Sequence, residues 1–320
     1  MMRILHLDNN HPFLEEQLVV LGFENVVDTQ SSKEIITQDI SQYYGLVIRS
    51  RFPIDKPFLQ KAKKLKFIAR VGSGLENIDV KAAKTMGIAV LAAPEGNSPS
   101  VGEHALGMLL GLMNKLPQGN KEVRIGKWCR EANRGEELGG KTIGIIGYGH
   151  TGKQFARKIA GFDVQVLCHD MLNNIGDQYA KQVPLETIYK QVDVISIHLP
   201  LNESTHQYVD HLFIDKMKKS FWLINTARGN QVVIEDLVNG LKSSKVKGAC
   251  LDVLDFETAA FDLNVEQSDD WQFLKESNRV ILSPHVAGWT NQSHLRLSKV
   301  ILSKIKQLMD TGHFLSEFKL

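Results

Sequence analysis

Residues 142–152 read TIGIIGYGHTG, an apolar run that leads directly into three closely spaced glycines. Gly147 permits a tight turn, Gly149 lets the main chain approach a phosphate, and Gly152 lets a following helix pack closely on the strand. The amino end of that helix offers N–H groups to a pyrophosphate. The stretch therefore predicts a strand, a turn and a helix that bind a dinucleotide.

A carboxylate supports this interpretation. The next apolar run, 164–168, is followed by Asp170, at about the 20-residue distance from the glycine turn where an acidic side chain accepts hydrogen bonds from ribose hydroxyls. The same charge would repel a 2′-phosphate, so the predicted cofactor is NAD and not NADP. The alternative is that Asp170 simply ends a strand.

Short apolar runs alternate with longer segments of helical periodicity along the whole chain, which is typical of parallel sheets covered by helices. The chain has 320 residues, more than one ordinary core holds. The runs form two series, one at 3–8, 46–50, 66–71 and 88–92, and the other at 142–146, 164–168, 192–197, 222–225, 247–252 and 280–282.

The first series predicts a small α/β domain, and the second predicts a complete doubly wound sheet. Between them, Ser100 and Glu103 form a capping-box pattern ahead of the apolar run 105–116, which predicts a long helix starting at Ser100. Residues 291–308 show near-helical apolar spacing and are expected to return to the first domain.

The predicted fold is therefore two doubly wound α/β domains with a cleft between them. The substrate domain is flavodoxin-like and comprises 1–98 plus 289–320. The NAD-binding domain is Rossmann-like and comprises 99–288.

Composition excludes several classes of protein. The chain carries 38 basic and 36 acidic residues, a net charge of +2, so no broad field attracts nucleic acid, and the basic run KAKKLK at 61–66 is interpreted as a solvated helix face. Cys129, Cys168 and Cys250 are far apart, which argues against disulfides and a zinc site. No uncharged apolar run approaches the roughly 20 residues of a membrane helix. A cytoplasmic protein without metal or membrane association is expected.

Three polar residues each follow a predicted strand of the second domain, where ligands gather in open α/β sheets. Arg228 lies in NTARG and offers a planar fork to a carboxylate. His285 lies in SPHVAG and can exchange a hydroxyl proton at physiological pH. Glu257, in LDVLDFE, could orient that histidine, but Asp255 is only two residues earlier and spacing does not choose between them.

Almost the whole chain resembles the D-isomer-specific 2-hydroxyacid dehydrogenase family, which includes D-3-phosphoglycerate dehydrogenase. The segments that carry the resemblance occur in family order: VGSGLENID, NSPSVGEHALGMLL, TIGIIGYGHTG, HLPLNEST, NTARG, GACLDV and SPHVAG.

The resemblance implies that Arg228 binds the substrate carboxylate and carbonyl, that Glu257 assists the histidine, and that His285 is the acid/base. It implies cofactor contacts at Gly147, Gly149, His150, Thr151, Gly152, Asp170, His198, Leu199, Pro200, Thr226, Ala227, Asp252 and the run from His285 to Gly288. Ser73 and Gly74 would approach the substrate from the first domain. A homodimer is also implied, with the helix from Ser100 as a contact, although the apolar periodicity of that helix would equally suit a buried helix.

Arg49 and Arg51, in VIRSR, are expected at a strand end of the first domain, where they could bind a phosphate or a second carboxylate. The RSR element resembles phosphoglycerate dehydrogenases, which implies 3-phosphoglycerate as substrate and a role in serine biosynthesis. If both arginines are merely solvated, glyoxylate, hydroxypyruvate or another 2-oxo acid is favoured. A different class also remains open, because the same fold serves in NAD-responsive transcriptional corepressors.

Overall fold

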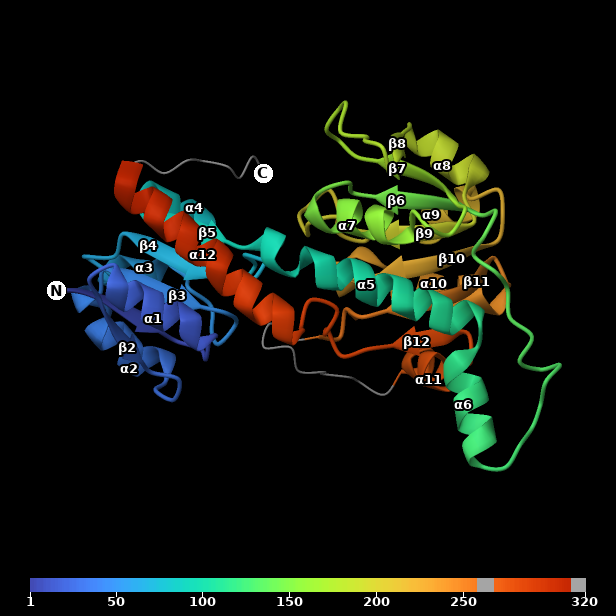
Figure 1. Ribbon diagram of the computed structural model, residues 1–320, viewed down its shortest axis with the longest axis horizontal. Coiled ribbons are helices and arrows are strands. Elements are labelled where there is room, and N and C mark those ends of the chain that lie inside the picture. The colour runs from blue at the N-terminus through green and yellow to red at the C-terminus, as the bar shows by residue number, and fades with distance from the viewer. Residues whose placement is uncertain (258–267, 312–320) are drawn as a thin grey trace. The chain divides into compact units, whose positions relative to one another are not determined.

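The chain forms two compact α/β units in a computed structural model that describes residues 1–257 and 268–311 (Figure 1). The first unit comprises Met1–Asn97 together with the chain from Trp289 onward, and the second comprises Ser98–Gly288. The predicted pair of doubly wound parallel sheets is confirmed.

The first unit contains a five-stranded parallel sheet in the order β2-β1-β3-β4-β5, the flavodoxin-like order. Its strands are β1 (Met2–His6), β2 (Phe23–Val27), β3 (Gly45–Ile48), β4 (Phe67–Arg70) and β5 (Ala89–Ala92). Its helices are α1 (Pro12–Val20), α2 (Lys33–Asp39), η1 (Ile40–Gln42), α3 (Lys56–Lys61), α4 (Val80–Thr85) and α12 (Asn291–Thr311).

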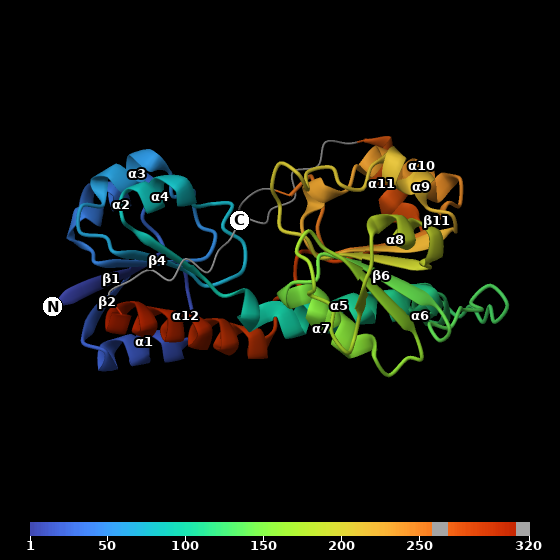
Figure 2. The same cartoon turned by 90° about the horizontal axis from the view of Figure 1, so that it is seen from above.

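Both faces of this sheet are covered, which explains why β3 and β4 are buried throughout and why β3 and all of β4 except Arg70 are apolar. Figure 2 shows α1 and α12 side by side on one face and α2, α3 and α4 on the other. Helix α12 packs onto the sheet through Leu297, Ile301, Leu302 and Ile305, as predicted for the C-terminal helix.

The second unit contains a seven-stranded parallel sheet in the order β12-β11-β10-β9-β6-β7-β8. Its strands are β6 (Thr142–Ile146), β7 (Gln165–His169), β8 (Lys181–Gln182), β9 (Val194–Ile197), β10 (Phe221–Asn225), β11 (Val246–Leu251) and β12 (Val280–Leu282). Its helices are α6 (Leu116–Arg124), α7 (His150–Ile159), α8 (Leu185–Gln191), α9 (His211–Lys216), η2 (Gly229–Gln231), α10 (Ile234–Lys242) and α11 (Asp269–Glu276), together with most of α5 (Pro94–Met113).

The strand order of this sheet reverses between β6 and β9, because the chain first builds outward through β7 and β8 and then returns. Helices α5 and α7 cover one face, and α8 to α11 cover the other (Figure 2). A reversal of this kind leaves a crevice at the carboxyl ends of the strands, where open α/β sheets bind ligands.

Three details differ from the expectation. Helix α5 begins at Pro94, so Ser100 lies inside the helix and is not its cap. Strands β2 and β8 and helix α6 were not predicted. The run KAKKLK starts at the last residue of α3, so its lysines are exposed mostly on the turn after that helix and not along a helix face.

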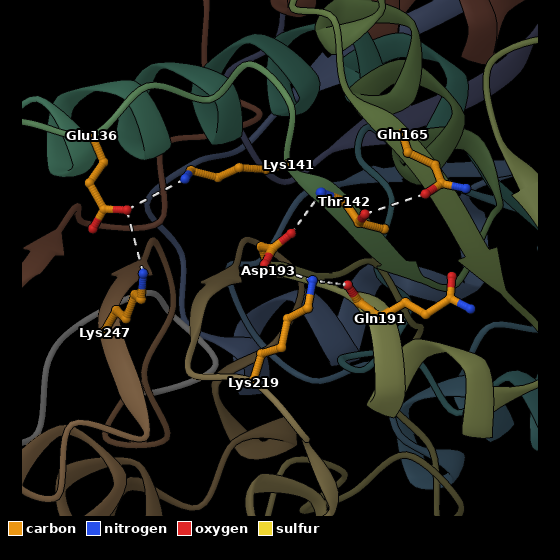
Figure 3. A network of polar contacts seen from close by, with 8 residues as sticks. All are labelled: Glu136, Lys141, Thr142, Gln165, Gln191, Asp193, Lys219 and Lys247. Carbon is orange, nitrogen blue, oxygen red and sulfur yellow. Dashed lines mark hydrogen bonds and ion pairs between the residues drawn. The ribbon is translucent and has the colours of Figure 1, made fainter.

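The amino-terminal edge of the second sheet is closed by charged side chains (Figure 3). The Asp193 carboxylate accepts hydrogen bonds from the Thr142 N–H at 2.9 Å and from Lys219 Nζ at 3.1 Å. Glu136 Oε2 lies 3.4 Å from Nζ of both Lys141 and Lys247. These contacts tie together segments that start four strands, at the edge opposite to the carboxyl ends.

Within residues 1–257 and 268–311, no helix combines the length and the apolar character needed to span a lipid bilayer.

Candidate active site

The predicted site residues of the second unit all follow strands of one parallel sheet. The glycine turn follows β6, Asp170 follows β7, and His198 follows β9. Arg228, Glu257 and His285 come after β10, β11 and β12, which are neighbours in the sheet. Because parallel strands end at the same edge, the fold gathers these residues along one edge of the unit.

The glycine turn has the geometry that its sequence predicts. Gly147 has φ of +89°, and a Cβ there would lie 2.8 Å from the His198 carbonyl carbon. A Cβ on Gly152 would lie 2.2 Å from the Gly147 oxygen. Helix α7 begins at His150, and both Gly149 and His150 are exposed, so the helix presents its first N–H groups outward. Gly147 and Gly152 are thus required for close backbone packing, whereas a Cβ at Gly149 would meet nothing within 4 Å, so the space in front of the helix fits a pyrophosphate.

Asp170 is held in place by the main chain. Its Oδ2 accepts the Tyr148 N–H at 2.8 Å and its Oδ1 accepts the Leu172 N–H at 2.9 Å. A carboxylate has about four lone-pair sites, so each oxygen can still accept a further hydrogen bond. Asp170 therefore joins the glycine turn to the end of β7 and keeps capacity for two ribose hydroxyls.

Two buried polar atoms near these strand ends have no hydrogen-bond partner among the described residues: His198 Nδ1 and Thr226 Oγ1. Burial lowers the pKa of His198 to about 3, so its imidazole is neutral, and its Nε2 shares a hydrogen bond with Ser196 Oγ at 2.8 Å. Buried polar groups are normally paired. Two unsatisfied groups beside the glycine turn and the NTARG turn are consistent with a polar ligand along this edge.

The turn that carries Arg228 is built by two side chains that sequence reasoning did not select. Asn225 Oδ1 accepts the Ala227 N–H at 3.0 Å, and Asn225 Nδ2 donates to the Arg228 carbonyl at 2.9 Å. Gln231 Oε1 accepts the Arg228 N–H, while Gln231 Nε2 donates to the carbonyls of Leu199 and Pro200. Both side chains are fully buried. Asn225 is the first residue of the NTARG motif and Gln231 lies just after it, and this proximity to Arg228 was their only sequence signal.

Gly229 brings this turn against the next one. A Cβ at Gly229 would lie 1.9 Å from the Leu254 carbonyl carbon and 2.4 Å from the Asp255 nitrogen. Only glycine allows this approach. The backbone after β10 therefore touches the backbone that leads to Glu257.

The structure chooses between the two acidic candidates. His285 Nδ1 lies 2.6 Å from Glu257 Oε1, and both side chains are largely buried, whereas Asp255 is exposed. A histidine that donates from Nδ1 to a carboxylate exchanges its proton through Nε2. The pair has the geometry of an acid/base group and its orienting carboxylate.

Asp252 is fully buried, and its carboxylate is occupied by the loop that carries the histidine. Oδ1 accepts the Val286 N–H at 2.9 Å and the Ser283 hydroxyl at 2.6 Å, and Oδ2 accepts the Ala287 N–H at 2.8 Å. Its own carbonyl accepts the His285 N–H. Burial raises the pKa of Asp252, but hydrogen bonds from His104, from Ser283 and from the Ala287 and Val286 N–H groups hold it below its usual value. The arrangement indicates that Asp252 shapes the loop, whatever contact it also makes with a cofactor.

Four candidate residues lie in the first unit. Arg51 donates to the carbonyls of Leu7, Asp28 and Ser31, and so stabilises the loop after β2. The Arg49 guanidinium instead stacks on Trp289, 3.9 Å from the ring centroid, and burial lowers its pKa.

Ser73 Oγ donates to Asn97 Oδ1 at 2.6 Å, and both Ser73 and Gly74 are half-buried. The two arginines of the RSR element therefore have different surroundings. The Arg51 guanidinium is occupied by three carbonyls, whereas that of Arg49 lies over the Trp289 ring.

Among the described ranges, no cluster of three or more His, Cys, Asp or Glu side chains could hold a metal ion.

Comparison with known proteins places these features in a family. Residues 106–287 match the model of the D-isomer specific 2-hydroxyacid dehydrogenase NAD-binding domain. A hydroxypyruvate reductase from Thermotoga maritima is 33% identical over 299 residues, which cover 92% of this chain and 95% of that protein. A D-3-phosphoglycerate dehydrogenase from Archaeoglobus fulgidus is 35% identical over 289 residues, which cover 89% of this chain and 53% of that protein. This chain thus spans about half the length of some curated relatives.

Among solved structures, an NADPH-dependent glyoxylate/hydroxypyruvate reductase from Sinorhizobium meliloti is 26% identical, with a TM-score of 0.83 over 98% of this chain and 97% of that one. The matched domain coincides with the unit that holds the glycine turn and the Glu257–His285 pair. By its domain match, its full-length relatives and its fold, the chain belongs to the D-isomer specific 2-hydroxyacid dehydrogenase family.

Proposed function

We propose that this chain is an NAD-dependent oxidoreductase that transfers a hydride between C2 of a small D-2-hydroxy acid and NAD. The observation that carries the proposal is the 2.6 Å contact between His285 Nδ1 and Glu257 Oε1, at the sheet edge that also bears the glycine turn and Arg228. Family membership supports the same reaction.

The residues after β6 and β7 would bind the cofactor. Gly147 and Gly152 let the turn and the helix pack closely, Gly149 leaves room for the pyrophosphate, and Asp170 would accept hydrogen bonds from the ribose. NAD, when bound, supplies or accepts the hydride. The Asp170 charge disfavours a 2′-phosphate, which is the reason to propose NAD and not NADP.

The reacting end of the substrate would meet two side chains. Arg228 binds the carboxylate through its planar fork and polarises the C2 oxygen. His285 removes the C2 hydroxyl proton at Nε2 during oxidation and returns it during reduction. Glu257 accepts from Nδ1–H, which fixes the ring tautomer and stabilises the protonated imidazole.

The test is a screen of 2-oxo acids, with and without phosphate groups, that follows NADH oxidation. We expect turnover with at least one acid, and His285→Ala should lower kcat by about 10² to 10⁴ because a general acid/base is lost. Glu257→Gln keeps the shape and removes the charge, so it should lower kcat less. A near-normal kcat for His285→Ala would refute the assignment.

For the substrate we propose two candidates. Arg49 and the D-3-phosphoglycerate dehydrogenase relatives support 3-phosphoglycerate, and with it a role in serine biosynthesis. The commitment of Arg51 to three carbonyls, together with the full-length hydroxypyruvate reductase relative, supports an unphosphorylated 2-oxo acid. If a phosphate binds at Arg49, Arg49→Ala should raise KM for the phosphorylated acid much more than for glyoxylate. Equal effects on both would favour the second candidate.

We also propose a homodimer in the cytoplasm, with a contact different from the expected one. The apolar side chains of α5 pack within the second unit, so α5 has little apolar surface left for a partner. Helix α6 has no buried residue, and with the following loop it exposes four large apolar side chains: Leu116, Val123, Ile125 and Trp128. Trp128 is 78% exposed.

Sedimentation of wild type and of an Ile125→Ser, Trp128→Ser variant tests this contact, because only the variant should be monomeric.

A corepressor-like binding protein is the alternative of another class. Such a protein would bind NAD and show no turnover on any acid in the screen.

A further inference from the structure

His104, a partly exposed residue of α5, reaches a buried polar group of the candidate active site. Its Nε2 lies 2.9 Å from Ser283 Oγ and 3.4 Å from Asp252 Oδ1. The His104 side chain is 27% exposed, whereas Asp252 is 1% exposed. The contact joins α5 to the ends of β11 and β12 within the second unit.

The directions of these hydrogen bonds follow from the proton count. Ser283 has one hydroxyl proton, and the 2.6 Å contact with the Asp252 carboxylate takes it in preference to the Met108 sulfur at 3.6 Å. Ser283 Oγ must then accept from His104. Since both neighbours of His104 Nε2 are acceptors, Nε2 carries a hydrogen whether the ring is neutral or charged.

The carboxylate at the centre of this network also fixes the backbone of the acid/base residue. Asp252 accepts the N–H groups of Val286 and Ala287 through its side chain and that of His285 through its carbonyl. His285 has φ of +51°, in the left-handed region that a non-glycine residue seldom adopts. A conformation of this kind persists only where its surroundings determine it.

We propose that His104 is a positioning residue for His285, acting through Ser283 and Asp252 on the backbone of the loop from 285 to 287. Its N–H completes the set of donors around the Asp252–Ser283 pair, which keeps that pair in the arrangement that receives the loop. Glu257 orients the imidazole ring, and the His104 network orients the backbone from which the ring projects. The kinetic consequence rests on the proposed function, but the structural consequence does not.

The experiment compares His104→Ala with His104→Gln, whose amide Nε2 can donate to Ser283 but cannot titrate. His211→Ala is the matched control, because His211 also lies beside a carboxylate, 3.5 Å from Asp236, but is 64% exposed on α9. Two readouts are taken: kcat and KM on the best 2-oxo acid, and the titration of His285 by histidine-labelled NMR without cofactor.

We expect His104→Ala to lower kcat by about tenfold or more, as loss of a supporting hydrogen bond near a reacting group does. KM for NADH should stay within about threefold, and the His285 titration should shift. His104→Gln should recover most of kcat and the wild-type titration, and His211→Ala should change neither.

A double-variant cycle separates a shared network from general damage. Ser283→Ala removes the hydroxyl that links His104 to Asp252, so the His104→Ala, Ser283→Ala pair should be no worse than the poorer single variant. Additive losses would overturn the proposal, as would wild-type kcat and titration in His104→Ala, or a Gln variant as poor as Ala. If no acid is turned over, the proposed function fails, but the NMR titration still decides whether His104 positions His285.

Discussion

Gly229→Ala should separate the two turns that carry Arg228 and Glu257. The new Cβ would start 1.9 Å from the Leu254 carbonyl carbon, and ordinary contact needs at least 3.4 Å, so one turn must move by about 1.5 Å. Overpacking of this kind costs about 1–3 kcal/mol of stability. A misplacement of about 1 Å in a reacting group costs about 10² in rate.

Two measurements check this prediction. The free energy of unfolding should fall by about 1–3 kcal/mol in chemical denaturation. The value of kcat/KM on the best 2-oxo acid should fall about 100-fold, because Arg228 and the Glu257–His285 pair no longer face the same carbon.

Gly107→Ala is the matched control. Gly107 lies in α5, where an added Cβ meets nothing within 4 Å. It should stabilise the protein by about 0.4–1 kcal/mol and leave kcat/KM unchanged. If Gly229→Ala keeps both wild-type stability and wild-type kcat/KM, the close contact does not control the site.

Three further predictions concern single side chains. Asp170→Ala should raise kcat/KM with NADPH relative to NADH at least tenfold, because the charge that repels a 2′-phosphate is gone; an unchanged ratio would contradict the role of Asp170. Arg51→Ala should lower the free energy of unfolding by about 2 kcal/mol, because three carbonyls lose a charged donor, and should raise KM for all acids alike. The His198 pKa, about 3 in the folded protein, lies below its unfolded value of 6.5, so the free energy of unfolding should decrease as pH falls from 6.5 toward 3, by up to about 1.4 kcal/mol per pH unit. The slope should be smaller in His198→Gln, and equal slopes in acid titrations of the two proteins would show that His198 does not titrate this way.

The sequence predicted those parts of the fold that rest on local pattern. The buried apolar runs of β6, β9 and β10 must be strands between helices, and the glycine turn defines its own neighbours. Strand β8 has two polar residues, Lys181 and Gln182, and exists only because β7 pairs with it. Helix α6 has no buried residue, so the sequence lacks the pattern of buried apolar positions that would predict a helix there.

The sequence indicated which residues are candidates for the site, but not which of these residues contact one another. Spacing could not distinguish Asp255 from Glu257, because the path of the backbone after β11 decides which carboxylate reaches His285. Arg49 and Arg51 look equivalent in sequence, yet their partners come from segments 20 or more residues away. Gln231 and Asn225 act on backbone atoms, and a sequence does not show which backbone atoms lack partners.

The charged side chains in Figure 3 have a consequence for how this protein can change. Asp193, Glu136 and their lysines anchor the starts of four strands, whereas the glycine turn, Arg228 and Glu257 follow the ends of three of these strands. The stabilising charged contacts and the reacting groups thus lie at opposite edges of one sheet. Substitutions at the amino-terminal edge of the sheet can therefore change its stability without changing catalysis. Substitutions at the carboxyl-terminal edge can change substrate specificity while the sheet itself stays stable.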